Sequence, residues 1–298
     1  TLEFFLLLVG SDMGSFEALI NSMSSISTAG IMLNPGGISY YNSLYVELVI
    51  TIFSILAGAN FMVYIYLMKG SLHQITHNIE IRTYLMIIII ASIIVTLSLR
   101  ISGTCDSIGQ ALRYGFFQVS SFVTTSGFVA YDYSAWPNIC SSIFLILMFI
   151  GGCAASTSGS IKSIRILIMM KLIKRGFFLR VHPRSVKAIK VGDSVISAKM
   201  ASTVSAFIIL YCFAFTVCSL ILSLQGLDME TTISATASLM SSTGIAFGEI
   251  GSGRYFGMFC APLKIFMSFI MMLGRLELFT VFIMFTPYFW RLHRYREE

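Results

Sequence analysis

The chain has 298 residues, of which 56% are hydrophobic and only 11% are charged, and its formal net charge is +6. A water-soluble domain carries roughly 25% charged residues, so this composition leaves too little polar surface to cover a soluble globule of this size. It excludes a soluble enzyme, a disordered chain and a free nucleic-acid-binding domain, and it indicates an integral membrane protein.

Apolar stretches near the roughly 20 residues that cross a bilayer predict the membrane spans. In chain order they are 44–68, 84–99, 201–224 and 262–289, and a fifth stretch, 139–172, is interrupted by small and polar residues. Residues 1–10 are apolar but too few to cross alone, and we interpret them as the tail of a helix whose beginning is absent. The six cysteines show no metal-ligand or redox spacing, and a disulfide between Cys105 and Cys140 is the less favoured interpretation.

The basic residues are concentrated in one part of the chain. Half of the 20 Lys and Arg residues lie between 162 and 199, whereas most other polar breaks are acidic. Because cytoplasmic loops carry an excess of Lys and Arg, we assign the basic segments to the cytoplasm.

Three segments that are too short or too polar to cross the bilayer resemble one another: 16–31, 113–128 and 230–245. Aligned on Gly30, Gly127 and Gly244, each has hydroxyl residues two and three positions before the glycine and a serine six positions before it. The hydroxyl pairs are Ser27 and Thr28, Thr124 and Thr125, and Ser241 and Ser242, and the serines are Ser24, Ser121 and Ser238. An aspartate precedes each segment (Asp12, Asp106, Asp228), and we expect it to cap a helix there.

Each repeat unit is therefore predicted to consist of a span, a half-helix, a glycine-containing loop and a second span. The C-terminal end of a half-helix that enters from outside carries partial negative charge toward the membrane centre, where it stabilises a cation. Non-helical backbone at this depth persists only where it lines a cavity, and several such loops around one axis can replace the hydration shell of an ion. A single Ser-Thr-Gly cluster would indicate ordinary helix packing, but three in register favour an ion filter.

The interruption at 151–160 consists of ten residues that are mostly small or polar, and their weak helix propensity predicts an unwound segment. Discontinuous membrane helices mark transport sites; the alternative is a flexible kink that permits close packing. Arg275 lies within the last apolar stretch, where a charge is costly unless it faces a cavity or a partner. Lys162 and Arg165 follow the interruption, and they either line a cytoplasmic vestibule or extend to the membrane interface.

These motifs resemble the Trk/Ktr/HKT potassium-transport superfamily, nearest its TrkH-like bacterial members. The resemblance rests on 27–30, 124–128, 151–165, 242–244 and the Gly-Arg-Leu-Glu block at 274–277. It implies an all-α multi-pass membrane protein built from M1–P–M2 units (span, pore half-helix, span) around a central pore, with three of four units present. The implied divisions are residues 1–70 (second unit, M1 truncated), 71–175 (third unit), 176–199 (basic cytoplasmic connector) and 200–298 (fourth unit).

The resemblance also implies roles for individual residues. The implied selectivity filter comprises Ser27, Thr28, Ala29, Gly30, Thr124, Thr125, Ser126, Gly127, Ser242, Thr243 and Gly244, with K⁺ held at Thr28, Gly30, Thr125, Gly127, Thr243 and Gly244. The implied gate comprises Gly151, Gly152, Ser156, Thr157, Ser158, Gly159, Ser160 and Arg275. Backbone oxygens, and not side chains, are the expected ligands.

The function implied by the resemblance is potassium uptake across the bacterial inner membrane, by a homodimer that binds a cytosolic nucleotide-binding regulatory subunit on its basic face. No organic cofactor, no enzymatic activity and no nucleic-acid partner are expected. A Na⁺-permeable pathway, or symport with Na⁺ or H⁺ as the coupling ion, stays open. An intramembrane hydrolase is a remote alternative, because it needs a base at membrane depth, and His73, His77, His182 and His293 all fall in polar cytoplasmic segments.

Overall fold

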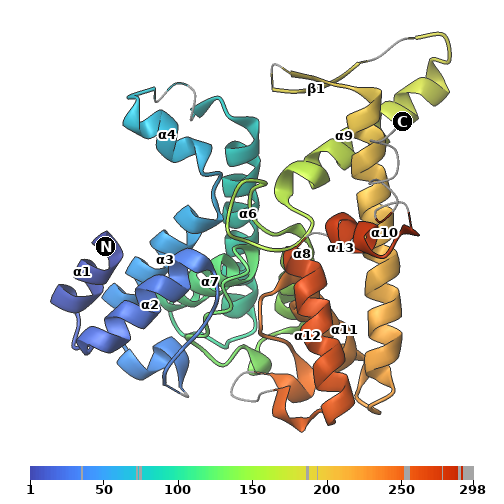
Figure 1. The fold of residues 1–298 in the computed structure, drawn as a ribbon. Helices are drawn as coiled ribbons and strands as arrows, with labels where there is room; N and C mark the ends of the chain where they lie inside the picture. The colour runs from blue at the N-terminus through green and yellow to red at the C-terminus, as the bar shows by residue number, and fades with distance from the viewer. Residues whose placement is uncertain are drawn as a thin grey trace.

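The computed structural model describes every residue except 35, 72, 74–75, 186–187, 193, 252–255, 277, 288–289 and 291–298. The described residues are mainly helical and include one small antiparallel hairpin (Figure 1). The all-α fold class predicted from the sequence is confirmed.

The first group of helices contains the first repeated segment. α1 (Leu2–Gly10) leads into the half-helix α2 (Ser15–Ser27), and α3 (Leu44–Gly58) and α4 (Met62–Met68) follow. A short 3₁₀ turn at Gly37–Tyr41 connects the loop after α2 to α3.

The second group contains the middle repeated segment and the interrupted stretch. α6 (Ile79–Ile101) is a long helix, α7 (Ile108–Val123) is the half-helix, and α8 (Asn138–Ile150) ends at the interruption. A 3₁₀ turn at Tyr133–Ala135 precedes α8, and α9 (Ser163–Val181) begins after the loop.

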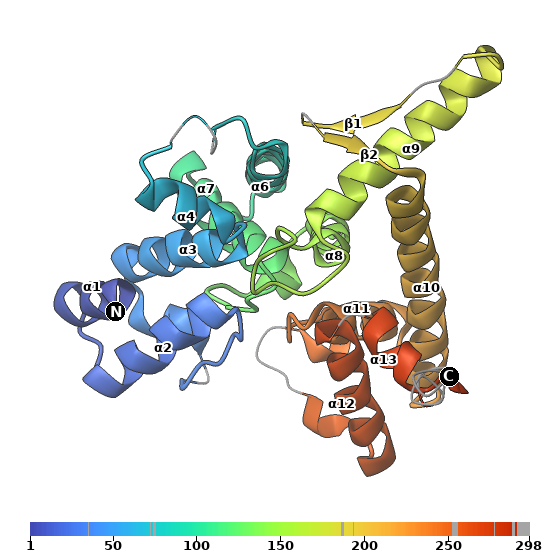
Figure 2. The same cartoon turned by 45° about the horizontal axis from the view of Figure 1, so that its top comes forward.

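The third group begins with the hairpin β1 (Ile189–Val191) and β2 (Ser194–Ile196), in which Ile189 pairs with Ile196. The long helix α10 (Ala198–Ser223), the half-helix α11 (Met229–Ser241), α12 (Ala261–Arg275) and α13 (Leu278–Met284) follow. Short 3₁₀ turns lie at Gly248–Ile250 and Phe256–Met258. In Figure 2 the three groups surround the loop between α8 and α9, which lies near the middle of the view.

The capping residues of the half-helices differ from the predicted aspartates. Asp228 occupies the N-cap position of α11, but its side chain accepts no capping hydrogen bond. α2 is capped at Gly14, and α7 is capped at Ser107, whose side chain accepts from the backbone N–H of Gly109. Asp12 and Asp106 therefore precede the caps, and this part of the prediction is wrong, because a hydroxyl or a glycine next to the first helical turn takes the position.

Two predicted spans are broken as well as the one at 139–172. Residues 44–68 bend by 101° between α3 and α4, and the last apolar stretch bends by 114° between α12 and α13. Among the described helices, α6 and α10 are long and apolar enough to cross a bilayer unbroken, and each bent pair adds one candidate span. Continuous spans at 44–68 and 262–289 were therefore wrong expectations.

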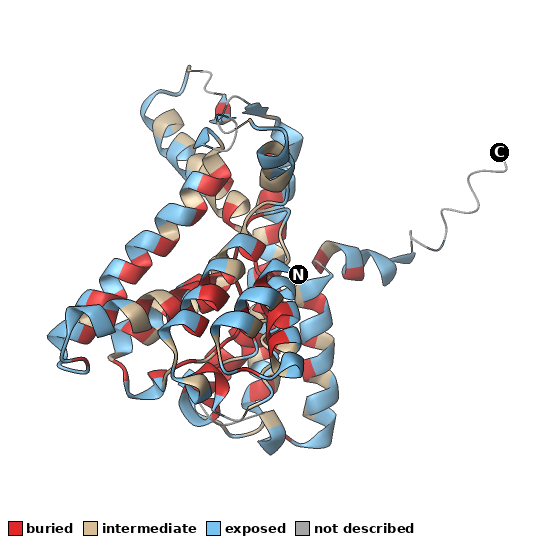
Figure 3. Ribbon diagram, turned by 90° about the vertical axis from the view of Figure 1, so that its left-hand side faces the viewer, coloured by how far each residue is buried: buried red, intermediate tan, exposed pale blue. Residues whose placement is uncertain are grey.

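Three clusters of buried residues form the core, and two of them cross between groups of helices. One joins α1 and α3 to Phe117 of α7; a second joins α6, α7 and α8 to Phe247 of the third group; and a third joins α10, α11 and α12. The outward faces of the helices are exposed, as Figure 3 shows in pale blue, and many of the exposed residues are apolar: α6, for example, exposes Ile89, Ile93 and Leu97. Exposed apolar faces around a buried polar centre suit a lipid environment.

Cys105 and Cys140 are both buried and form no disulfide bond. Burial raises the pKa of the Cys105 thiol, and the neighbouring Asp106 carboxylate raises this pKa further. A buried thiol with a raised pKa is a poor nucleophile at neutral pH.

Candidate ion filter and intramembrane gate

The three half-helices end in the same backbone motif. Thr28, Thr125 and Ser242 all adopt left-handed conformations, with φ of 51°, 55° and 58°. Two positions later Gly30, Gly127 and Gly244 also have positive φ, of 65°, 73° and 85°. Glycine adopts such angles without steric cost, which explains why it recurs at this position.

The repeated serine six positions before each glycine supplies the carbonyl that closes this motif. The backbone N–H groups of Ala29, Ser126 and Thr243 donate to the carbonyl oxygens of Ser24, Ser121 and Ser238, at 2.9, 3.0 and 2.9 Å. Together with a bond from the preceding residue, this is the Schellman pattern that ends many helices. The sequence repeat is therefore a repeat of helix-end geometry.

Two of these serines also hold the loop through their side chains. Ser24 Oγ accepts a hydrogen bond from the backbone N–H of Ile31 at 2.7 Å, and Ser121 Oγ donates to the carbonyl oxygen of Phe128 at 2.7 Å. Ser238 Oγ is buried and has no hydrogen-bond partner among the described residues. In α2 and α7, a serine side chain inside the half-helix is thus hydrogen-bonded to the backbone of the residue that follows the loop glycine.

The three loops touch one another in sequence. A Cβ atom built on Gly30 would overlap the carbonyl oxygen of Ser126, and one built on Gly127 would overlap the carbonyl oxygen of Thr243. A Cβ on Gly244 would meet no described atom within 4 Å. Each of the first two glycines thus packs against the residue just before the glycine of the next unit, and the third faces open space.

The burial of the three loops agrees with these contacts. In the middle loop Thr124, Thr125 and Ser126 are fully buried. In the outer two loops Ala29 and Gly244 are exposed, although Thr28 and Thr243 are buried. The loop that contains Gly127 therefore has neighbours on both sides, whereas the loops that contain Gly30 and Gly244 each have one open side.

The interrupted stretch forms a non-helical loop at 151–162, between α8 and α9. We call it the intramembrane loop. Thr28 Oγ1 donates to the carbonyl oxygen of Thr157 at 3.0 Å, and the Gly159 N–H donates to Thr125 Oγ1 at 2.9 Å. A Cβ on Gly159 would overlap the Ser241 carbonyl oxygen. The loop therefore lies directly against the ends of all three half-helices.

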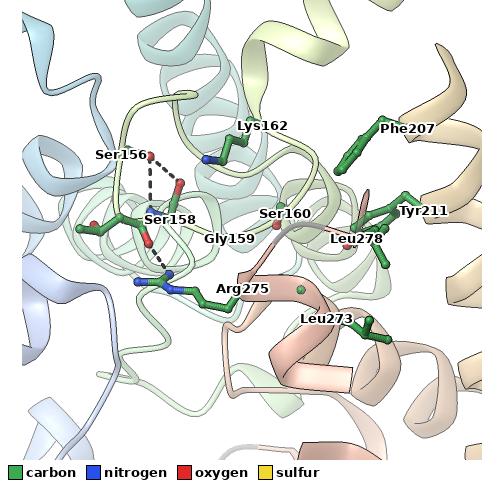
Figure 4. A pocket seen from close by; sticks show the side chains of 12 residues that line it. Ser156, Ser158, Gly159, Ser160, Lys162, Phe207, Tyr211, Leu273, Arg275 and Leu278 are labelled. Carbon is green, nitrogen blue, oxygen red and sulfur yellow. Dashed lines mark hydrogen bonds between the residues drawn. The ribbon is translucent and has the colours of Figure 1, made fainter. Parts of the chain in front are cut away.

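Arg275 is the last residue of α12, and its side chain points at the intramembrane loop (Figure 4). Its guanidinium group donates to the carbonyl oxygen of Thr157 and, at 3.4 Å, to that of Ser27. Arg275 thus joins the loop to the end of α2. Glu277, the final residue of the sequence motif around Arg275, lies outside the described residues.

A cavity of about 140 Å³ lies beside the loop, between α10 and the α12–α13 bend (Figure 4). The side chains that line it away from the loop are Phe207, Tyr211, Leu273, Arg275 and Leu278. Ser156, Ser158 and Ser160 of the loop line the other side, and Ser156 Oγ and Ser158 Oγ are hydrogen-bonded at 2.9 Å. The cavity is therefore polar on the side that the loop forms and mostly apolar on the side of α10 and α12.

The two cationic residues after the loop have different surroundings. Lys162 Nζ donates to the carbonyl oxygen of Ala154 within the loop at 2.7 Å. The Arg165 guanidinium carbon lies 4.0 Å from the centroid of the Phe207 ring, a cation–π geometry. Lys162 therefore belongs to the loop, and Arg165 is placed against α10.

Of the three buried carboxylates among the described residues (Glu3, Glu47 and Glu80), two contact other groups of helices and were not named as site residues from the sequence. Glu80, in the first turn of α6, contacts the intramembrane loop. Glu47, on α3, is bound by Arg113 at 2.7 and 2.8 Å and by the Tyr131 hydroxyl at 2.6 and 2.7 Å. The available signal was a lone acidic residue at the edge of an apolar run. Glu47 was counted only among the acidic polar breaks, and Glu80 was not considered.

Comparison with known proteins identifies the family. The model of the TrkH family, described as cation transport proteins, matches residues 9–291. The chain belongs to the TrkH family. The Trk system potassium uptake protein TrkG of Escherichia coli K12 is 32% identical over 277 residues, covering 93% of this chain and 56% of that protein. TrkH of Vibrio parahaemolyticus is also 32% identical, over 282 residues, covering 94% of this chain and 58% of that protein.

The fold of this TrkH-family chain agrees with a solved structure. The crystal structure of the potassium transporter TrkH from Vibrio parahaemolyticus superposes with a TM-score of 0.90 at 30% sequence identity, covering 97% of this chain and 62% of that one. The resemblance inferred from the sequence motifs is confirmed, and so is the multi-pass membrane fold. The chain spans about three fifths of the length of these relatives.

Proposed function

We propose that this chain forms three quarters of a potassium-uptake pathway across the bacterial inner membrane. The observation that carries the proposal is the sequence of contacts from Gly30 to Ser126 and from Gly127 to Thr243. Three loops that follow half-helix C-termini and pack edge to edge can present backbone oxygens to a partly dehydrated cation. The names of the relatives, Trk system potassium uptake proteins, support K⁺ as the transported ion.

In this proposal the filter consists of 27–30, 124–127 and 242–244, with K⁺ at Thr28, Gly30, Thr125, Gly127, Thr243 and Gly244. The left-handed Thr28, Thr125 and Ser242 support it, because positive φ at these residues and at the glycines that follow lets successive carbonyl oxygens turn toward one axis. An additional unit of the same kind would pack against the open side of Gly244 and complete the ring. The divisions at 1–70, 71–175, 176–199 and 200–298 belong to the same proposal.

The gate in this proposal is the intramembrane loop together with Arg275. Its contacts with Thr28, Thr125 and Ser241 support this role, because a loop in this position blocks the cytoplasmic side of the filter. Arg275 adds a positive charge at the same level, which opposes the passage of a cation. Lys162 acts as part of the loop, and Arg165 lines the vestibule below it.

The basic charge of helix α9 supports the proposal that a cytosolic partner binds there. Lys171, Lys174, Arg175 and Arg180 lie along it, and the β1–β2 hairpin packs beside it at the end of the molecule opposite the half-helix N-termini (Figure 1). We propose that a nucleotide-binding regulatory subunit docks here and that the whole protein is a homodimer. Symport with Na⁺ or H⁺ is the alternative transport mode.

The test is ion flux into vesicles that contain the full-length protein. We expect K⁺ to enter faster than Na⁺ at equal concentrations and driving force. Equal Na⁺ entry, or K⁺ entry that requires a Na⁺ or H⁺ gradient, would favour the alternative transport modes. An intact reconstituted protein that passes neither ion would overturn the proposal and return attention to the hydrolase.

A further inference from the structure

The first half of the intramembrane loop is hydrogen-bonded to the break between α3 and α4. The N–H of Cys153 donates to the carbonyl oxygen of Gly58 at 2.9 Å, and the N–H and hydroxyl of Thr157 both donate to that of Ala57, at 3.4 and 3.2 Å. In return, the N–H of Phe61 donates to the carbonyl oxygen of Ala155 at 2.7 Å. Carbonyls at a helix end lack partners within the helix, so the loop satisfies the groups that the break exposes.

Glu80 fastens the same two segments together through its side chain. One carboxylate oxygen accepts a hydrogen bond from the N–H of Ala154 at 2.6 Å, and the other accepts from Asn60 Nδ2 at 2.8 Å. Glu80 is only 7% exposed. Since Lys162 Nζ binds the carbonyl oxygen of Ala154 at 2.7 Å, one residue of the loop is held on both sides by charged side chains. Hydrogen bonds to charged groups are stronger than neutral ones.

The third partner in this arrangement, α4, is weakly packed. None of its seven residues is buried, and it meets α3 at 101°. A short helix without buried side chains is the part of a fold that moves at the lowest cost. The break therefore links a helix with few packing contacts to the loop, and Glu80 on the long helix α6 lies between them.

We propose that Glu80 is a positioning residue that latches the intramembrane loop shut, and that movement of α4 with Asn60 is the motion that releases it. The proposal rests on the proposed gate function of the loop. Loss of the carboxylate frees the Ala154 N–H and the Asn60 amide together. The loop then opens more often, while the half-helix ends, which Glu80 does not touch, keep their geometry.

Opening of the loop can be measured at Cys153, which lies within it. The Cys153 thiol is fully buried, so it reacts faster with a water-soluble reagent when the loop opens. The full-length protein is reconstituted in vesicles on a background in which Cys153 is the sole cysteine. A membrane-impermeant methanethiosulfonate reagent is applied from the cytoplasmic side, and its rate of reaction is measured for the parent, Glu80→Ala, Glu80→Gln and Asn60→Ala. We expect rates in the order Glu80→Ala, then Glu80→Gln, then the parent, with Glu80→Ala about tenfold faster, as loss of a charged hydrogen-bond pair implies. Because both Glu80 variants also remove a negative charge near the thiol, Asn60→Ala, which keeps that charge, should react faster than the parent as well.

Two controls separate unlatching from general loosening. Glu230→Gln removes an exposed carboxylate in the first turn of α11, away from the loop, and should leave the Cys153 rate unchanged. A second background keeps only Cys218, which is 5% exposed on α10. Glu80→Ala should not change its rate. Equal acceleration of Cys153 and Cys218 would overturn the latch, as would unchanged Cys153 rates in both Glu80 variants.

Flux in the same vesicles distinguishes this inference from the proposed function. Faster Cys153 modification with faster K⁺ entry supports both the latch and the gate. Faster modification without any change in K⁺ entry supports the latch and overturns the gating role of the loop. If no preparation passes K⁺ but the order of Cys153 rates holds, the latch stands and the transport proposal fails.

Discussion

At the scale of single residues, close contact adds to backbone angle as a reason for glycine at two of the three loop positions, Gly30 and Gly127. Gly103, in an exposed turn, has a φ of 71° and no described atom within 4 Å of a built Cβ. Gly127 has almost the same φ, of 73°, but a side chain there would overlap the Thr243 carbonyl oxygen. The two positions therefore separate strain from overlap.

Gly127→Ser should reduce K⁺ selectivity over Na⁺ by at least about tenfold in the full-length protein. A non-glycine residue in a strained region costs about 1–3 kcal/mol, and about 1.4 kcal/mol corresponds to a factor of ten. The overlap adds to this by displacing a carbonyl of the adjacent loop. Relative K⁺ and Na⁺ flux measures the effect, with Gly103→Ser as the matched control, and an unchanged flux ratio would contradict the assignment of this loop to the filter.

Ser121→Ala should destabilise the protein by about 1–3 kcal/mol, because it removes the hydroxyl that donates to the buried Phe128 carbonyl. Ser238→Ala is the matched change in the fourth unit, where the hydroxyl has no described partner, and its effect on stability should be close to zero. Thermal unfolding of the two purified variants tests this difference. Similar losses in both would mean that the repeated serine acts through packing and not through this bond.

At the scale of elements, the repeated half-helices and the intramembrane loop could be predicted, whereas the other breaks could not. Ser24, Ser121 and Ser238 recur because each accepts the hydrogen bond that ends its half-helix. The sequence repeat therefore predicted three helix ends with the same geometry. The break after α3 falls at Ala59–Phe61, and of these three residues only Asn60 is polar. It exists because the loop from another unit binds the carbonyls there, and a contact between 57–61 and 153–157 cannot be read from either stretch alone.

Gly159→Ala should raise K⁺ flux by pushing the intramembrane loop away from α11, because its Cβ would overlap the Ser241 carbonyl oxygen. Deleting residues 156–159 should act in the same direction and more strongly. Gly176→Ala, on α9 with no described atom within 4 Å of a built Cβ, is the control. A fall in flux through protein that elutes and unfolds normally would indicate that the loop is a structural kink.

At the scale of the whole molecule, the three units differ in how far they are enclosed. The loop that contains Gly127 is buried between its two neighbours. The loop that contains Gly244 has a neighbour on one side only, and Gly244 itself is exposed. The ring of Phe247 in the third group of helices stacks on those of Phe122 and Phe144 in the second group, with centroids 5.7 and 6.4 Å apart. Neighbouring units are therefore joined behind the filter as well as at it.

Gly244 tests the proposed additional unit in the full-length protein. If strain alone mattered, Gly244→Asn would be milder than Gly244→Ala, because asparagine tolerates positive φ better than alanine. We expect the opposite order, with Gly244→Asn the more damaging to K⁺ selectivity, because the larger side chain meets the loop that fills the open side. Selectivity measured by paired K⁺ and Na⁺ flux decides between the two orders.

The buried Glu47 has a consequence for the outer end of the proposed filter. Arg113 belongs to α7 and Tyr131 to the segment that follows Gly127, so Glu47 on α3 braces this part of the proposed filter from the first group of helices. Surface ion pairs weaken as dissolved ions screen them, whereas a carboxylate that is 3% exposed is largely shielded from such screening. The contact of Glu47 with Arg113 and Tyr131 should therefore be equally stable at low and at high ionic strength.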